Sequence, residues 1–111
     1  MITMENVTFD DFKKLNIKIG QITSAKKHEN ANKLLVLQID LGSETRQIIA
    51  GGAEFHKPES LIGKQVPVLL NIAPKMIRGI EGHGILLAVD FNNQPCFLTP
   101  EEQVPVGSIV K

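Results

Sequence analysis

The sequence predicts an all-β domain: a five-stranded OB-fold Greek-key barrel with a short N-terminal helix, a short helix between strands three and four, and a C-terminal extension. Three observations support this prediction. The strand-like apolar runs are all short, a brief helical stretch follows the third run, and prolines interrupt the apolar tail. Short antiparallel strands protect their edges by closing into a barrel, and a five-stranded barrel with one helix after strand three is the OB-fold.

The N-terminal segment TFDDFKKL predicts a short amphipathic helix. Thr8 is a candidate N-cap with Asp11 three residues later, and Phe9 and Phe12 recur at a spacing of three. The next segment, NIKIGQITSAKKH, alternates apolar and polar residues and predicts strand one, with a bulge or sharp bend at Gly20.

The middle of the chain predicts the other four strands. The polar loop HENANKL leads into strand two, LLVLQIDLG, and strand three, ETRQIIAGG, follows as a hairpin. Pro58 and Glu59 indicate a turn into a brief helix that ends at Gly63. Strands four and five are predicted in VPVLLNIAP and GILLAVDF, and the prolines of CFLTPEEQVPVGSIVK make that tail an element outside the barrel.

A chain of 111 residues has the usual size of one domain, and the predicted barrel core occupies about residues 16–92. Segments 1–15 and 93–111 extend beyond a minimal barrel. A chain this short gains buried apolar surface by sharing such elements with a second copy, so we expect a homodimer. The expected interface residues are Phe9, Phe12, Val104, Val106 and Ile109.

The charge balance and the lengths of the apolar runs exclude some classes of function. Twelve Lys and Arg balance twelve Asp and Glu, which argues against a protein that coats nucleic acid indiscriminately. No apolar run approaches the roughly 18 residues of a membrane span, and the N-terminus is acidic rather than a basic signal-peptide start. We therefore expect a cytoplasmic protein without a membrane partner.

Metal, redox and catalytic sites have little support in the sequence. Cys96 is the only cysteine, which excludes an intrachain disulfide, and we expect it to be half-buried. The three histidines lack the local spacing of metal ligands, so neither a metal nor another cofactor is expected. Because no nucleophile and base are paired in the sequence, an enzyme is the weakest functional hypothesis.

The stretch NIAPKMIRGIEGHGILLA carries more charged residues and glycines than a chain reversal requires. Lys75 and Arg78 lie three apart between strands four and five, where an arginine can donate two hydrogen bonds to one phosphate and a lysine acts as a point charge. Gly79, Gly82 and Gly84 lack a Cβ and let the backbone approach a ligand closely. The alternative is that the charges are solvated and the glycines only form a wide turn.

Three sequence blocks occur in the same order as in a known protein family: HENANKLLVLQIDLG, TRQIIAGG and LIGKQVPVLLNIAPKMIRGIEGHGILLA. Together they resemble the tRNA-binding domain appended to methionyl-tRNA synthetases and endothelial-monocyte-activating polypeptide, and also the free-standing dimeric tRNA-binding proteins and their secretion-chaperone relatives. The likeness extends from FDDFKKLNIKIGQI to the closing PVGSIVK. It implies a non-catalytic, structure-specific tRNA-binding protein that is free-standing, as a homodimer, or acts in trans with an aminoacyl-tRNA synthetase such as methionyl-tRNA synthetase.

The resemblance also implies RNA-contacting roles at the matching positions, which are Lys33, Arg46, Asn71, Lys75 and Arg78. Five positions depart from the family's usual residues: Glu29 replaces a proline, Asn32 an aspartate, Gly82 a serine, His83 a glutamine and Ile85 a methionine. His83 lies next to the position of the missing hydroxyl and is a further candidate, because an imidazole can stack on a base.

The residues themselves leave other roles open. Arg46 can pair with Asp40 or Glu44 across the hairpin, and Asn71 can cap a turn. Lys33 follows a polar loop, where a solvated lysine is as good an interpretation as a ligand contact. For His83, the simplest interpretation is an exposed loop residue.

Aromatic residues are sparse, with five Phe and no Tyr or Trp, and Phe55 is expected in the core. Because proteins that coat single strands rely on aromatic stacking, recognition of a folded RNA's shape fits the chain better. The second functional hypothesis is an export-related chaperone that binds unfolded peptides. It needs an exposed apolar groove, which Met76, Ile77, Ile80 and Ile85 could line.

Overall fold

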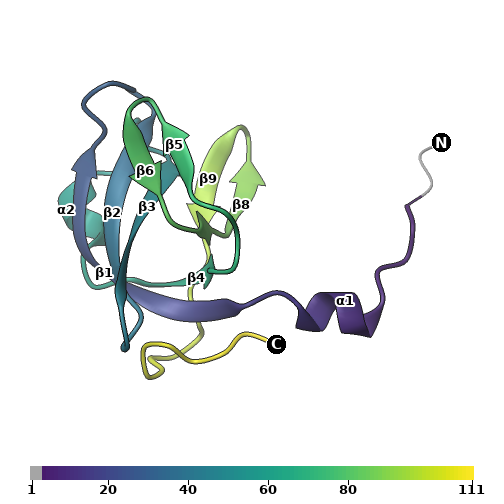
Figure 1. The fold of residues 1–111 in the computed structure, drawn as a ribbon. Helices are drawn as coiled ribbons and strands as arrows, with labels where there is room; N and C mark the ends of the chain where they lie inside the picture. Colours follow the sequence, from purple (N-terminus) through teal and green to yellow (C-terminus); the bar gives the residue numbers. More distant parts are fainter. Residues whose placement is uncertain (1–3) are drawn as a thin grey trace.

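The computed structural model describes residues 4–111, in which a five-stranded antiparallel sheet curls into a nearly closed barrel (Figure 1). The strands lie in the order β3-β2-β1-β4-β7, and the two outer strands pack against each other at the seam. Their bounds are β1 Ile17–Lys27, β2 Leu34–Asp40, β3 Thr45–Gly51, β4 Gln65–Leu69 and β7 Ile85–Leu86. The predicted five-stranded OB-fold barrel is confirmed.

The barrel core is formed by apolar side chains from neighbouring strands. Leu35, Leu37 and Ile39 of β2 are fully buried, together with Ile22 of β1 and Ile48 of β3. Burying an aliphatic side chain of this size contributes about 1.5–3 kcal/mol. The other fully buried side chains are Leu61, Val66 and Val68. Apolar runs in β2 and β4, rather than a strict alternation of apolar and polar residues, therefore supply most of the core of the barrel.

The predicted irregularity in β1 lies at a different residue. Gly20 pairs regularly with Val66 of β4, and the register of β1 against β2 shifts between Ile22 and Ser24. The glycine serves close packing instead, because a Cβ at Gly20 would overlap the side chain of Ile39. The irregularity predicted at Gly20 as a bulge thus lies two to four residues later, between Ile22 and Ser24.

Both predicted helices are present. The first, α1, spans Phe9–Lys13, and the Thr8 Oγ1 accepts a hydrogen bond from the Asp11 backbone N–H at 3.0 Å, as the capping pattern predicts. The second, α2, spans Pro58–Leu61 between β3 and β4 and buries Leu61 in the core. In contrast, α1 buries none of its own residues.

The segment after β4 forms two hairpins that the sequence did not predict. Within the predicted loop, β5 (Lys75–Ile77) pairs with β6 (Ile80–Gly82). The predicted fifth strand is split, because β7 stays in the barrel while β8 (Ala88–Phe91) pairs with β9 (Gln94–Phe97). The Asn92-Asn93 turn of this second hairpin has positive φ at both residues, a geometry that favours a two-residue hairpin.

The C-terminal extension lies along β1, outside the five-stranded sheet, as the prolines predict. The Val110 N–H donates a hydrogen bond to the Ile17 carbonyl at 2.9 Å. The buried side-chain amide of Gln65 exchanges two hydrogen bonds with the Val104 backbone, at 2.7 and 3.0 Å. These bonds attach the tail firmly to the barrel.

The N-terminal arm, residues 4–15, projects away from the barrel and contains α1 (Figure 1). Its aromatic side chains are accessible, with Phe9 69% and Phe12 39% exposed. Residues 1–3 of the predicted N-terminal dimerisation element lie outside the described residues. Of the other predicted interface residues, Ile109 is exposed, whereas Val104 and Val106 are half-buried within the chain itself.

Candidate nucleic-acid interface

Three connections meet at one end of the barrel, which we call the barrel tip: the loop 28–33 and the turns of the β5–β6 and β8–β9 hairpins (Figure 1). Hydrogen bonds join the first two. The His28 Nε2–H donates to the Ile77 carbonyl at 3.0 Å, and the Asn30 side-chain amide donates to the Arg78 carbonyl at 3.2 Å. The loop is therefore held against the β5–β6 hairpin.

Arg78 forms the turn of this hairpin with Gly79, and its side chain is exposed. The two residues have φ values of 51° and 87°, the left-handed region that glycine and asparagine favour. For an arginine this conformation costs roughly 1–2 kcal/mol. Positive φ at both central residues is the geometry of a two-residue hairpin turn, and the Asn92-Asn93 turn has it as well.

Two more exposed cations belong to the same loop and hairpin. Lys33 ends the loop, and its carbonyl accepts hydrogen bonds from the N–H groups of Gly52 and Ala53 at 3.0 and 3.2 Å, which fixes its backbone. Lys75 begins β5. In the described part of the chain, neither lysine nor Arg78 lies within ion-pair distance of a carboxylate. These three cations therefore have no protein counter-charge, and the same is true of every Lys and Arg of the described residues except Lys14 and Arg46.

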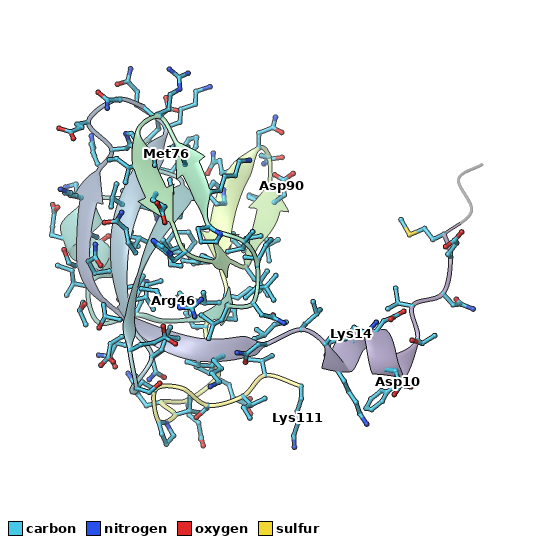
Figure 2. The ribbon with its side chains drawn as sticks, viewed as in Figure 1. Asp10, Lys14, Arg46, Met76, Asp90 and Lys111 are labelled. Carbon is cyan, nitrogen blue, oxygen red and sulfur yellow. The ribbon has the colours of Figure 1, made fainter. Side chains whose placement is uncertain are left out.

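Arg46 lies lower in the barrel than the hairpin that Met76 marks (Figure 2). Its Nε donates to a Glu44 carboxylate oxygen at 2.7 Å, and its Nη1 donates to the carbonyls of Leu70 at 2.6 Å and His83 at 3.4 Å. The hydrogen bond from Arg46 and its positive charge hold the pKa of Glu44 below the usual range. Most of its donors are therefore used within the protein, and the pairing with Glu44 is confirmed.

Asn71 is also engaged within the protein. Its Oδ1 accepts a hydrogen bond from the Asn16 N–H at 2.7 Å, and its Nδ2 donates to the Lys14 carbonyl at 2.5 Å. These two bonds hold the base of the N-terminal arm against the end of β4. They are not the local turn cap that the sequence left open, because both partners lie more than 50 residues earlier in the chain.

His83 lies beside Arg46 rather than at the barrel tip. Its Nε2 is 3.0 Å from a Glu81 carboxylate oxygen, and its backbone N–H donates to the Gln47 carbonyl at 2.8 Å. The side chain is 43% exposed, so one face of the ring remains accessible. The predicted RNA contacts therefore fall into separate groups rather than one continuous patch.

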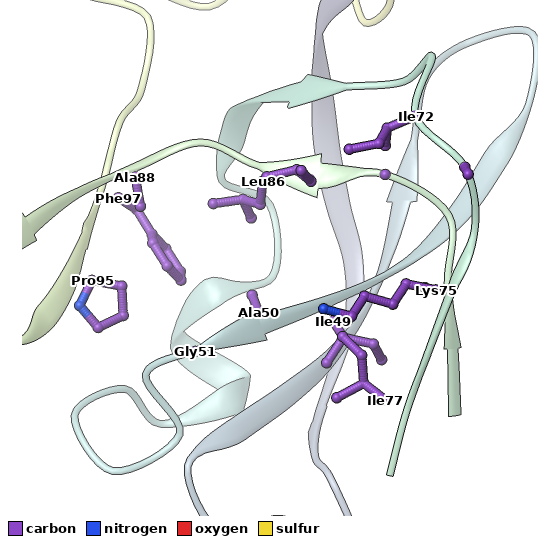
Figure 3. Close-up of a pocket in the computed structure, with 14 residues that line it drawn as sticks. Ile49, Ala50, Gly51, Ile72, Lys75, Ile77, Leu86, Ala88, Pro95 and Phe97 are labelled. Carbon is purple, nitrogen blue, oxygen red and sulfur yellow. The ribbon is translucent and has the colours of Figure 1, made fainter. Parts of the chain in front are cut away.

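An apolar groove of about 320 Å³ opens between β3, β7 and the two hairpins (Figure 3). Its walls include Ile49, Ile77, Leu86 and Phe97. Lys75 is the charged residue among the described residues that line it, and Figure 3 shows its side chain extending along the groove past Ile49. The groove thus combines an apolar wall with one cation, next to the barrel tip.

The groove that the chaperone hypothesis requires is present, but its walls differ from the predicted set. Ile77 and Ile85 line it as expected, whereas Met76 and Ile80 do not. Met76 is 61% exposed and points away from the groove. Phe97 takes its place in the wall and comes from β9, which the sequence assigned to the tail.

Two burial predictions are wrong. Phe55 is 51% exposed, whereas the buried residues of its connection are Gly52 and Ala53. Cys96 is exposed rather than half-buried, since β9 alternates its side chains and directs Pro95 and Phe97 toward the groove. Neither residue belongs to the core.

Three other signs of function that residues 4–111 could carry are membrane-spanning helices, metal sites and unsatisfied buried polar groups. No helix in this range is long and apolar enough to cross a membrane, and no three His, Cys, Asp or Glu side chains are grouped to hold a metal ion. Every buried side-chain nitrogen or oxygen in this part of the chain has a hydrogen-bond partner. The barrel tip and the groove are the features that a function must explain.

Known proteins with similar sequences are methionine–tRNA ligases. The chain is 51% identical over 106 residues to that of Methanococcoides burtonii and 41% identical over 108 residues to that of Thermococcus kodakarensis. These matches cover 94% and 97% of this chain but only 16% and 15% of the two ligases. The chain therefore spans a small part of the length of these relatives.

Two solved structures have nearly the same fold over their whole length. A protein from Pyrococcus horikoshii described as related to methionyl-tRNA synthetase superposes with a TM-score of 0.91 at 34% identity, covering 97% of this chain and all of that one. Chaperone CsaA from Bacillus anthracis superposes with a TM-score of 0.87 at 28% identity, covering 96% of this chain and all of that one. A family model described as a putative tRNA binding domain matches residues 17–109, nearly the entire barrel and tail, and the chain thus belongs to this family of tRNA-binding domains.

Proposed function

We propose that the chain binds tRNA without catalysing a reaction, either free-standing or in trans with an aminoacyl-tRNA synthetase such as methionyl-tRNA synthetase, in the cytoplasm. The observation that supports this most is the group of unpaired cations at and beside the barrel tip. Lys33, Lys75 and Arg78 come from two segments that hydrogen bonds hold together, and no carboxylate pairs with them in the described chain. Cations held in this way suit a phosphate backbone.

Each cation has a distinct part in the proposed contact. The Arg78 guanidinium can donate two parallel hydrogen bonds to one phosphate, whereas Lys33 and Lys75 act as point charges. The barrel tip carries no exposed Trp or Tyr, since the chain has neither. Phosphate contacts and shape, rather than stacking on a row of bases, therefore dominate the proposed recognition.

Salt dependence tests this proposal. If about three phosphates are neutralised per subunit, the logarithm of the binding constant should fall with the logarithm of salt concentration with a slope of roughly 2–3. The measurement is a filter-binding titration with total tRNA at several salt concentrations. A flat response with tRNA still bound would mean that the contacts are not made to phosphates.

A second candidate function is supported by the groove. Its apolar walls beside an exposed rim would suit an unfolded peptide segment, which a chaperone of the CsaA type would bind. Binding of this kind buries apolar surface and depends little on salt. The salt series therefore separates the two functions as well as testing the first.

We further propose that the free-standing chain is an isologous homodimer formed through the N-terminal arm and the C-terminal extension. The arm exposes Phe9 and Phe12 without burying any residue of α1, and Ile109 of the tail is also exposed. Apolar side chains presented on a projecting arm gain stability by packing against a second copy.

Light scattering at micromolar concentration should give twice the 12.2 kDa mass of one chain. The double variant Phe9→Ser, Phe12→Ser should give the monomer mass, because it removes the apolar surface of the arm. Phe55→Ser is the matched control, since Phe55 is comparably exposed but lies on the barrel. A monomer mass for the parent chain would refute the dimer.

A further inference from the structure

We propose that His28 and Asn30 are positioning residues that hold the Arg78 turn in the conformation in which its guanidinium meets RNA. This inference rests on the proposed tRNA-binding function. It concerns two residues that make no contact with phosphate in the proposal and act only through the hairpin.

The His28 side chain connects the loop to the hairpin from a buried position. The residue is 4% exposed, and its Nδ1 faces the Asn30 backbone N–H at 3.0 Å. Because Nδ1 accepts that hydrogen bond, the ring proton of the neutral imidazole lies on Nε2, which donates to the Ile77 carbonyl at 3.0 Å. One ring thus orders the loop and holds the residue before Arg78.

Asn30 holds the next carbonyl. Its side-chain amide donates to the carbonyl of Arg78 at 3.2 Å, across 48 residues of sequence. Consecutive carbonyls of the turn, those of Ile77 and Arg78, are therefore both bound by the same loop. Two independent long-range hydrogen bonds fix the peptide groups on either side of the arginine.

The turn end of the hairpin needs such support because the hairpin's own pairing is weak and the side-chain hydrogen bond from β3 reaches β6 at Glu81 rather than the turn. Each of its strands has three residues, and an isolated two-stranded hairpin is at best marginally stable in water. Its turn also holds Arg78 at a φ of 51°, which favours rearrangement toward ordinary backbone geometry. Bonds from the loop oppose this rearrangement, so less ordering remains to be done when RNA binds.

A double-mutant cycle on tRNA affinity tests the inference. Asn30→Ala removes one exposed hydrogen bond and should weaken tRNA binding about five-fold in the parent, but less than two-fold when Arg78→Ala is already present. The melting temperature should change little in either background. Asn32→Ala is the matched control, because Asn32 is exposed in the same loop and makes no side-chain hydrogen bond in the described chain.

The outcomes separate the inference from the function on which it rests. If Arg78→Ala weakens binding and Asn30→Ala is neutral, or equally harmful in both backgrounds, the positioning role is wrong and the proposed site stands. If Arg78→Ala has no effect, the proposed site is wrong and the inference falls with it.

A second pair of variants tests the histidine. His28→Gln keeps one donor and one acceptor and should retain more tRNA affinity than His28→Leu, whose side chain can bind neither the hairpin nor the loop backbone. Circular dichroism establishes that both variants are folded at the assay temperature. Equal affinity of two folded variants would overturn the role of His28.

Discussion

Arg78→Glu is expected to weaken tRNA binding by roughly ten- to a hundred-fold while the melting temperature stays close to that of the parent. The substitution replaces an attraction to phosphate by a repulsion at an exposed turn. Glutamate and arginine meet the same steric cost at positive φ, since both have a Cβ, so the folded state should lose within about 0.5 kcal/mol. Filter binding and thermal unfolding measured on the same preparations give the two results.

Two further substitutions calibrate this result. Lys75→Ala should cause a smaller loss of affinity and lower the salt slope by about one unit, because it removes a single phosphate contact. Lys57→Ala is the control, as Lys57 is an exposed residue at the start of α2, away from the β5–β6 hairpin. Unchanged tRNA binding by Arg78→Glu would show that Arg78 makes no contact with tRNA and that the hairpin turn serves only to reverse the chain.

The second large effect is expected on stability. Arg46→Met should lower the free energy of unfolding by roughly 2 kcal/mol, which corresponds to a melting temperature about 10 °C lower for a domain of this size. The reason is that the Leu70 carbonyl loses a donor at 2.6 Å at the end of β4, and Glu44 loses its partner. Arg46→Lys should recover little, since an ammonium group cannot reach the same three partners in a planar fork.

Thermal unfolding followed by circular dichroism measures this effect, with Arg78→Met as the control at an exposed arginine. If Arg46→Met unfolds at the parent's temperature but fails to bind tRNA, then Arg46 is an RNA contact and its hydrogen bonds within the barrel contribute little. We therefore expect substitutions of Arg78 to weaken tRNA binding with little effect on stability. Substitutions of Arg46 should instead lower the stability of the fold.

The parts of the fold that local pattern determines were predictable. The β-rich run LLVLQIDLG predicts the strand β2, and the Thr8 capping pattern predicts the start of α1. The β5–β6 hairpin was missed because its three-residue strands carry almost no periodic signal. Its support comes from distant segments: the loop 28–33 binds its turn, and the Gln47 side chain of β3 donates to the Glu81 carbonyl of β6 at 2.8 Å.

The candidate site was predictable only in part. Residue type and position identify Lys33, Lys75 and Arg78 as cations. The sequence does not reveal which side-chain donors will be used in hydrogen bonds to backbone carbonyls of the folded chain. Arg46 donates to a carbonyl 24 residues away, and Asn71 holds a segment 55 residues before it. Such partners appear only once the chain is folded.

The positioning residues escaped sequence reasoning for a related reason. His28 and Asn30 lie in the polar segment HENANKL, which indicates a loop but does not say that one of its side chains is buried. The available signal was a histidine at the boundary between a strand and a polar loop, where a ring can accept from one segment and donate to another. Phe97 was overlooked in the same way, because its role depends on the path of β9.

A filter-binding titration of the unsubstituted chain with total tRNA, run beside an identical titration with an unfolded peptide, tests the central claim most directly. The chain should bind tRNA with the salt dependence described above and bind the peptide much more weakly at every salt concentration. Tight binding to the peptide together with no binding to tRNA would contradict the claim that the exposed cations of the barrel tip serve tRNA.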